Sequence, residues 1–152
     1  MKTFFVAAGI ACVLGSVLAQ KLMRAQETVA PMMISFTDLK CVELPQVKGT
    51  QFAALSGDPK TGPFTQMRKI PAGTDNGSHS HSSEITMVVI SGVLYVGPDA
   101  ASGKDFGPGS VIVMPADWVH VSGCRPGSDC IFYQEGKGKF DYKPAGNTAT
   151  RR

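Results

Sequence analysis

The stretch GTDNGSHSHSSEITMVVISG (73–92) decides the fold, because it joins two histidines to an apolar run that ends in a Ser-Gly turn signal. His79 and His81 lie two residues apart, and residues two apart in a β-strand share one face of the sheet. Neutral imidazole is the commonest metal ligand in proteins, so such a pair would aim both rings at one point. The run ITMVVI (85–90) predicts a buried strand, and the next run, VLYVG (93–97), predicts its hairpin partner.

A second stretch, GSVIVMPADWVH (109–120), supplies the third and last histidine, His120. An H-x-H pair alone is weak evidence, since it recurs by chance and histidines are often solvated. Three imidazoles on two predicted strands, with none elsewhere in the chain, favour a metal site instead. We predict that His79, His81 and His120 bind one divalent ion, with an affinity that falls below about pH 6.5, where imidazole gains a proton.

Length and composition bound the fold class and the partners. The 152 residues suffice for one domain with a core, and 17 glycines and 10 prolines suit short strands joined by tight turns. Alternating runs such as FTQMRKI (64–70) are separated by Gly and Pro, and no long segment has a helical period. An all-β sandwich or small barrel is therefore predicted. A formal net charge of +3 with scattered basic residues predicts no nucleic-acid partner.

The first 19 residues have the pattern of a cleaved secretory signal peptide. Lys2 gives a positive start, residues 4–14 are apolar, and Ala19 is the small residue before the expected cleavage point. We expect a mature protein that is secreted or periplasmic and has no membrane association; a retained membrane anchor is the alternative. The expected mature organisation is an N-terminal arm (20–41), a barrel domain (42–146) and a frayed polar tail (147–152).

The two histidine stretches resemble the paired motifs of the cupin superfamily, which are double-sheet β-barrels of jelly-roll type. Seven residues fall on motif positions: Gly73, His79, His81, Gly92, Gly109, Pro115 and His120. The chain is more closely similar to small secreted bacterial cupins of unassigned function, which share its LSGDP run (55–59), its H-x-H-S-S-acid motif (79–84) and an FD-x-KP-like ending (140–144). The resemblance implies a cupin barrel with one divalent transition metal, Fe, Mn, Zn, Cu or Ni. It also leaves a homodimer through edge strands open.

Three positions depart from the cupin motifs. Only two residues separate Glu84 from His81, so simple alternation puts the Glu84 carboxylate on the opposite face of the strand. A β-bulge would return Glu84 to the site as a fourth metal ligand or a general base; otherwise it is a solvated acid at the barrel mouth. Asp117 replaces a glycine, so it must accept a left-handed backbone, which Asp tolerates better than most residues. Cys124 replaces the closing asparagine of the second motif.

Three functions remain open for such a site. The first is a metal-dependent enzyme, resembling a dioxygenase, that acts on a small chelating substrate such as an enol, phenol or diketone. The second is a non-catalytic protein or sensor that binds a metal or a small ligand. The third is metal-free sugar or isomerase chemistry, which three converging histidines disfavour. The candidate acids, bases and polar groups of the pocket are Glu84, Gln66, Arg68, Tyr95, Tyr133 and Gln134.

The remaining chemistry-bearing residues are aromatic side chains and cysteines. Trp118 and Phe132 are expected to pack in the core or at the barrel mouth. Cys124 and Cys130 flank a five-residue turn between two predicted strands, and residues opposed across a hairpin lie within disulfide range. We predict this bridge in an oxidising compartment, with Cys41 unpaired and buried. Three buried thiols, or pairings through Cys41, are the alternatives.

Overall fold

The structure is a computed structural model, and it describes residues 30–44, 47–99 and 101–146. The predicted signal peptide and tail, and the first ten residues of the predicted arm, lie outside these residues. The chain divides into two units, Met1–Ile34 and Ser35–Arg152, and every described strand belongs to the second. None of the helices in the described ranges has the length and apolar character needed to cross a membrane.

The described part of the second unit consists of eleven strands and one short 3-10 turn. In chain order these are η1 (Phe36–Asp38), β1 (Val42–Glu43), β2 (Gln51–Gly57), β3 (Phe64–Ile70), β4 (Asp75–Ser80), β5 (Ile85–Ser91), β6 (Leu94–Gly97), β7 (Lys104–Phe106), β8 (Val111–Met114), β9 (His120–Cys124), β10 (Cys130–Gly136) and β11 (Lys143–Pro144). The all-β prediction is confirmed.

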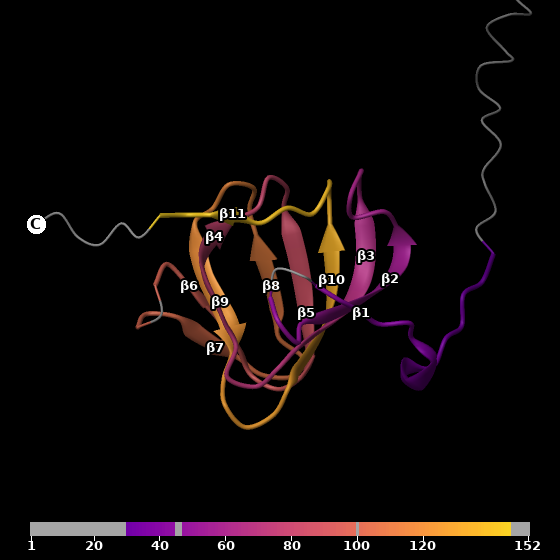
Figure 1. The fold of residues 1–152 in the computed structure, drawn as a ribbon, viewed down its shortest axis with the longest axis horizontal. Helices are drawn as coiled ribbons and strands as arrows, with labels where there is room; N and C mark the ends of the chain where they lie inside the picture. The colour runs from indigo at the N-terminus through magenta and orange to yellow at the C-terminus, as the bar shows by residue number, and fades with distance from the viewer. Residues whose placement is uncertain (1–29, 45–46, 100, 147–152) are drawn as a thin grey trace, which may run out of the picture. The chain divides into compact units, whose positions relative to one another are not determined.

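The strands form two antiparallel sheets (Figure 1). The six-stranded sheet has the order β1-β2-β3-β10-β5-β8, and the five-stranded sheet has the order β11-β4-β9-β6-β7. Strands that are distant in the sequence are neighbours in both sheets, as β3 and β10 are, or β4 and β9. The chain therefore crosses repeatedly between the sheets, which is the connectivity of a jelly-roll barrel.

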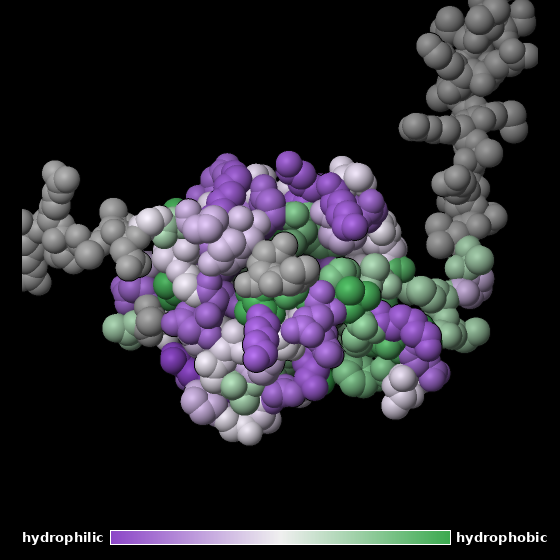
Figure 2. Space-filling model, in the orientation of Figure 1, coloured by the Kyte–Doolittle hydropathy of each residue, from purple (hydrophilic) through white to green (hydrophobic). Residues whose placement is uncertain are grey.

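The side chains between the sheets follow from strand alternation. In β3, Phe64, Gln66, Arg68 and Ile70 are buried while the residues between them are partly exposed, as the alternating pattern predicts. The buried apolar cluster draws on both sheets: Phe64, Ile70, Ile85, Met87, Val89, Leu94, Val96, Ile112, Met114, Cys124, Cys130 and Phe132. Two glutamines and an arginine thus enter the interior of a mainly apolar barrel. Figure 2 shows hydrophobic residues near the centre of one face, with hydrophilic residues around them.

The predicted hairpin between residues 85–90 and 93–97 is wrong. β5 pairs with β10 and β8 in one sheet, whereas β6 pairs with β9 and β7 in the other. Gly92, which lies between them, has a φ of 74°, and a Cβ there would lie 2.7 Å from the carbonyl oxygen of Asp129. The turn signal is therefore correct, but it carries the chain from one sheet to the other instead of back along the same sheet.

The predicted disulfide between Cys124 and Cys130 is present, with a Cα–Cα distance of 5.8 Å. The reason given for it needs correction, because Cys124 ends β9 in one sheet and Cys130 begins β10 in the other. The bridge therefore ties the two sheets together at one end. Cys41 has no disulfide partner in the described ranges, as predicted. The prediction that it is buried is wrong, because Cys41 is exposed, as are all of residues 40–43.

Candidate metal centre

Strand register brings the three histidines together. His79 lies near the end of β4, His81 directly follows that strand, and His120 is the first residue of β9. β4 and β9 pair antiparallel with His79 opposite His120. Residues opposed in this way have neighbouring side chains on one face, so the H-x-H pair gains its third imidazole from the adjacent strand.

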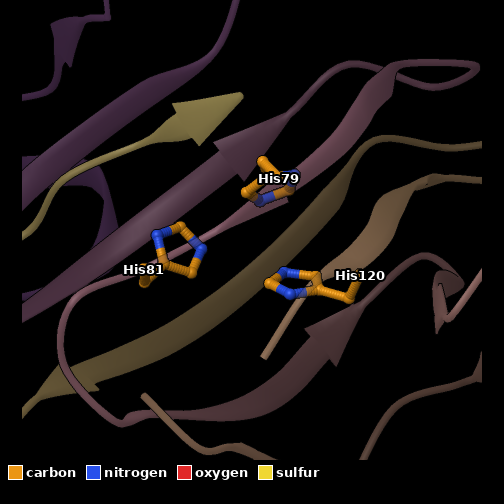
Figure 3. Close-up of side chains that lie close together, drawn as sticks. All are labelled: His79, His81 and His120. Carbon is orange, nitrogen blue, oxygen red and sulfur yellow. The ribbon is translucent and has the colours of Figure 1, made fainter. Parts of the chain in front are cut away.

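The three imidazole rings face a common point (Figure 3). Their candidate ligand atoms all lie within 4.8 Å of one another. The ring centroid of His79 is 4.4 Å from that of His120 and 4.9 Å from that of His81, and His81 and His120 are 5.4 Å apart. All three side chains are buried, with 1 to 6% of their surface exposed.

Backbone carbonyl groups fix how each ring presents its nitrogens. The Nδ1 atoms of His79 and His120 donate to the carbonyl oxygens of Gly77 and Trp118, each at 2.9 Å, and Nδ1 of His81 donates to that of Asp141 at 2.5 Å. A carbonyl oxygen only accepts, so each Nδ1 carries the proton, and each neutral ring keeps a lone pair on Nε2.

This hydrogen-bond arrangement is the one that metal-binding histidines show, because the second nitrogen orients the ring and raises its basicity. The Nε2 atom of His120 is buried and has no hydrogen-bond partner among the residues that the structure describes. A buried polar atom without a partner is costly, and a metal ion would satisfy it. The donor set therefore fits a divalent transition metal.

Burial also keeps the histidines in the form that binds a metal. The pKa of His79 is lowered to about 4, chiefly by desolvation and also by the proximity of His120, His81 and Arg68, while its hydrogen bond to the Gly77 carbonyl acts in the opposite direction. Desolvation likewise lowers the pKa of His81 and that of His120. At neutral pH all three rings are uncharged, and neutral imidazole is the ligating species.

An aromatic side chain covers each histidine. Tyr142 stacks on His79 with a centroid distance of 4.5 Å, and Trp118 stacks on His120 at 5.1 Å. The ring of Phe140 lies 5.2 Å from that of His81. These aromatic groups restrict the rotation of the imidazoles and keep water away from them. Trp118 is 38% exposed, as expected for a side chain at the mouth, and Phe132 is 2% exposed within the core.

Asp141 is a site residue that sequence reasoning missed. Its carbonyl oxygen holds Nδ1 of His81, and its carboxylate accepts hydrogen bonds from the backbone N–H and the hydroxyl of Ser82. The segment after it forms β11, which pairs with β4 and places Pro144 opposite His79. The only signal was the FD-x-KP-like ending, and no local pattern shows that it lies beside a strand some sixty residues earlier.

The structure does not bring Glu84 into the histidine group. Glu84 immediately precedes β5, and its Oε1 lies 2.6 Å from Nζ of Lys137, which immediately follows β10. The irregular register occurs before the histidines, between Asp75 and Ser78, and not after them. A bulge at that earlier place cannot turn Glu84 inward, so its predicted roles as a ligand and a base receive no support from this arrangement.

Asp117 has the left-handed backbone expected of it, with a φ of 59°. Its N–H donates to the carbonyl oxygen of His81 at 2.8 Å, so the turn before β9 is attached to the segment that carries the first two histidines. Nζ of Lys143 lies 3.0 Å from the Asp117 carboxylate. The turn that contains Asp117 is therefore bonded both to the segment that carries His81 and to β11.

A cavity of about 530 Å³ opens beside the histidines. His79 and His81 line it, and its apolar wall is formed by Met87, Leu94, Val96, Met114 and Phe132. Of the predicted pocket residues, Arg68 and Gln134 line the cavity, whereas Glu84, Tyr95 and Tyr133 do not. Gln66 is buried beside them, and its Nε2 donates to Oε1 of Gln134 at 2.6 Å. The size and mostly apolar lining suit a small organic molecule.

Solved structures with the same fold come from several kinds of protein. The polyketide cyclase RemF from Streptomyces resistomycificus superposes with a TM-score of 0.64 at 20% identity, over 79% of this chain and 89% of that one. A proposed acetylacetone dioxygenase from Methylibium petroleiphilum superposes with a TM-score of 0.62 at 17% identity, over 82% and 88%. The anti-sigma factor ChrR, solved in complex with SigE of Rhodobacter sphaeroides, gives 0.55 at 22% identity, over 86% and 70%.

These identities are low, so the structural matches show a shared fold and no more. No curated protein matches the chain. The family described as the ChrR cupin-like domain matches residues 29–141, which is about three quarters of the chain and includes all three histidines. This match agrees with the resemblance carried by the two histidine motifs, and the chain belongs to the ChrR cupin-like family of the cupin superfamily.

Proposed function

We propose that this protein binds one divalent transition metal through Nε2 of His79, His81 and His120 and acts as an oxygenase-like enzyme on a small chelating oxygenated molecule. The observation that carries the proposal is the set of three Nδ1 hydrogen bonds to backbone carbonyls, which leaves three Nε2 lone pairs in one buried group. When bound, Fe, Mn, Zn, Cu or Ni would supply a Lewis acid with open positions for a substrate.

The residues of the chain itself would position the substrate and exclude water. The apolar part of the cavity wall, which includes Met87, Leu94 and Phe132, offers no hydrogen-bonding group to a solvent molecule. The carbonyls of Gly77, Trp118 and Asp141 prevent the imidazoles from turning. A substrate that reaches the histidines would therefore meet a rigid and largely dry surface, in which electrostatic interactions are stronger than in water.

Two of the structural neighbours support this substrate class. RemF is described as a polyketide cyclase, and the Methylibium protein as a proposed acetylacetone dioxygenase, so both names point to molecules with several oxygen atoms. Adjacent carbonyl or enol oxygens can chelate one ion. The cavity of about 530 Å³ is large enough for molecules of this kind.

We also propose that the protein works outside the cytoplasm, in the periplasm or after secretion. The Cys124–Cys130 disulfide supports this location, because such bonds persist in oxidising compartments. The signal-peptide pattern of residues 1–19 points the same way. The expected partner is a small molecule, without nucleic acid or membrane, and a homodimer remains open.

A sensor that binds a metal or a ligand without turnover is the second candidate. Two observations favour it: the match to the ChrR cupin-like family, and the pairing of Glu84 with Lys137. Among the described residues, the ligand group contains no carboxylate, so no acid stands within it to take a substrate proton. The two candidates predict the same metal site and differ only in turnover.

Metal analysis followed by an activity panel tests the proposal. Protein purified without added metal should contain about one equivalent, His81→Ala and His120→Ala should lose it, and Glu84→Gln should retain it as the matched control. Wild-type metal content in both histidine variants would refute the site. Acetylacetone, catechol and a flavonol would then be incubated with metal-loaded protein under air and under nitrogen. Oxygen-dependent loss of a substrate supports the enzyme, and tight metal without any loss supports the sensor.

A further inference from the structure

Arg68 is a charged residue inside the barrel. It lies on the inward face of β3, opposite Phe132 of β10, and only 9% of it is exposed. It lines the same cavity as His79 and His81. Its charge is close enough to these histidines to oppose their protonation. The guanidinium and the candidate metal ligands thus share one space.

No carboxylate of the described residues neutralises Arg68. The four ion pairs that the structure describes are formed by Lys69, Arg125, Lys137 and Lys143. Within the described ranges, Arg68 hydrogen-bonds to the amide oxygen of Gln134, at 3.5 Å from Nη1, and its Nε is buried without a partner. A guanidinium has five N–H donors, so most of the donor capacity of Arg68 has no partner among the described residues.

The acidic residues that line the cavity are already engaged. Oε1 of Glu43 accepts the N–H of Gly49 at 2.8 Å, and both carboxylate oxygens of Asp141 accept hydrogen bonds from Ser82. Gln134 is equally occupied, because the same oxygen accepts the amide of Gln66. The positive charge of Arg68 is therefore available to a group from outside the chain.

Burying a charge without a partner is expensive, and proteins avoid it unless something compensates. Part of the compensation comes from the rings of Phe140 and Phe132, whose centroids lie 5.2 and 5.9 Å from the guanidinium carbon. Burial lowers the pKa of Arg68 to about 10, which leaves it charged at neutral pH. A charged, planar guanidinium between aromatic rings, at the wall of a mostly apolar cavity, is suited to bind a planar anion.

We propose that Arg68 anchors a carboxylate of the substrate or ligand, so that the cavity selects small organic acids over their neutral analogues. The guanidinium would hold the carboxylate with paired N–H···O bonds, and the rest of the molecule would extend along the apolar wall. That its other oxygen atoms reach the metal rests on the proposed function. The anion preference itself depends on Arg68 and not on the metal.

Benzoate and benzamide test this preference, because they have the same shape and differ in charge. Their dissociation constants would be measured by calorimetry on the purified full chain, with metal content recorded for every sample. We expect wild-type protein to bind benzoate at least about tenfold more tightly than benzamide, which is the low end for a charge-assisted contact. Equal binding of the two, or no binding of benzoate, overturns the proposal.

Three variants separate Arg68 from the total charge of the protein. Arg68→Met removes the anchor, and Gln134→Glu gives the guanidinium an internal carboxylate at the position of the present amide oxygen; both should abolish the preference. Arg125→Met makes the same change in net charge outside the cavity and should retain it. A preference that survives both Arg68→Met and Gln134→Glu refutes the role of Arg68, and if Arg68→Met does not fold, Gln134→Glu decides. If wild-type protein contains no metal but still prefers benzoate, the proposed metal site is refuted and the role of Arg68 is not.

Discussion

The proposed metal should be released at a pH well below the pKa of an ordinary histidine. A metal competes with protons for imidazole, and a free imidazole with a pKa of about 6.5 begins to lose this competition below that pH. In the structure, burial lowers the pKa of His79 to about 4, and those of His81 and His120 move in the same direction. The expectation of weakening from pH 6.5, drawn from the sequence, therefore needs revision.

The size of the effect follows from the fraction of each ring that is protonated. At pH 5.5, an imidazole with a pKa of 6.5 is about 90% protonated, and three such ligands would lower the apparent affinity by roughly a thousandfold. With a pKa of about 4, His79 is only about 3% protonated at pH 5.5, so its share of that loss nearly vanishes. Proton uptake by His79 therefore weakens metal binding strongly only as pH approaches about 4, and the lowered pKa values of His81 and His120 shift their contributions to lower pH as well.

The assay is the dissociation constant of Zn²⁺, measured by competition with a chelator of known affinity between pH 4.5 and 7.5. After correction for the chelator, we expect the affinity to fall less between pH 7.5 and 5.5 than three imidazoles with an ordinary pKa would require, because the pKa of every ring is lowered. An apparent affinity that falls by about two decades or more between pH 6.5 and 5.5 would refute the reasoning, because three solvated imidazoles with a pKa of about 6.5 lose about that much over this range. The metal-free protein provides a second test. Histidines of the unfolded chain take up protons at a higher pH than those of the folded chain, so the free energy of unfolding should decrease as the pH falls from about 6.5 to 4.

Three further outcomes are expected. His120→Ala should remove nearly all bound metal, whereas Glu84→Gln, which alters only an ion pair with Lys137, should leave metal content within about 10% of wild type by elemental analysis. Replacing Cys124 and Cys130 together by Ser should lower the free energy of unfolding in urea by about 2 kcal/mol, because the closed loop is short. Asp117→Gly should change the thermal midpoint little, while Asp117→Val should destabilise by about 1 to 2 kcal/mol, since a β-branched residue resists a φ of 59°.

The sequence predicted the grouping of the three histidines better than it predicted the path of the chain. The spacing of His79 and His81 is a local property, and the second motif identified His120 without any knowledge of pairing. The opposition of His79 and His120 across β4 and β9 is a matter of sheet register, which no local pattern contains. The turn at Gly92 was recognised for the same local reason, yet its destination in the other sheet depends on the whole barrel.

Residues that act through their backbone were the hardest to predict. Gly77, Trp118 and Asp141 orient the imidazoles with carbonyl oxygens, and every residue type has such an oxygen. Arg68 was named only as one of several polar candidates in the pocket. Its significance became visible when the structure showed that the acidic groups near it were bonded elsewhere. The amino-acid type at a position does not show whether its charge has a partner in the folded protein.

The charges of the site make the two proposals support each other. Three neutral imidazoles leave the full charge of a divalent ion in place, since Glu84 is paired with Lys137 and does not offset it. Arg68 adds another positive charge at the wall of the same cavity. Like charges in a poorly hydrated space repel one another, so this pairing is unfavourable until an anion enters. A chelating organic acid would satisfy both centres at once, whereas a neutral chelator would satisfy only the metal. The carboxylate that the histidine group lacks is thus the group that the proposed substrate is best placed to bring.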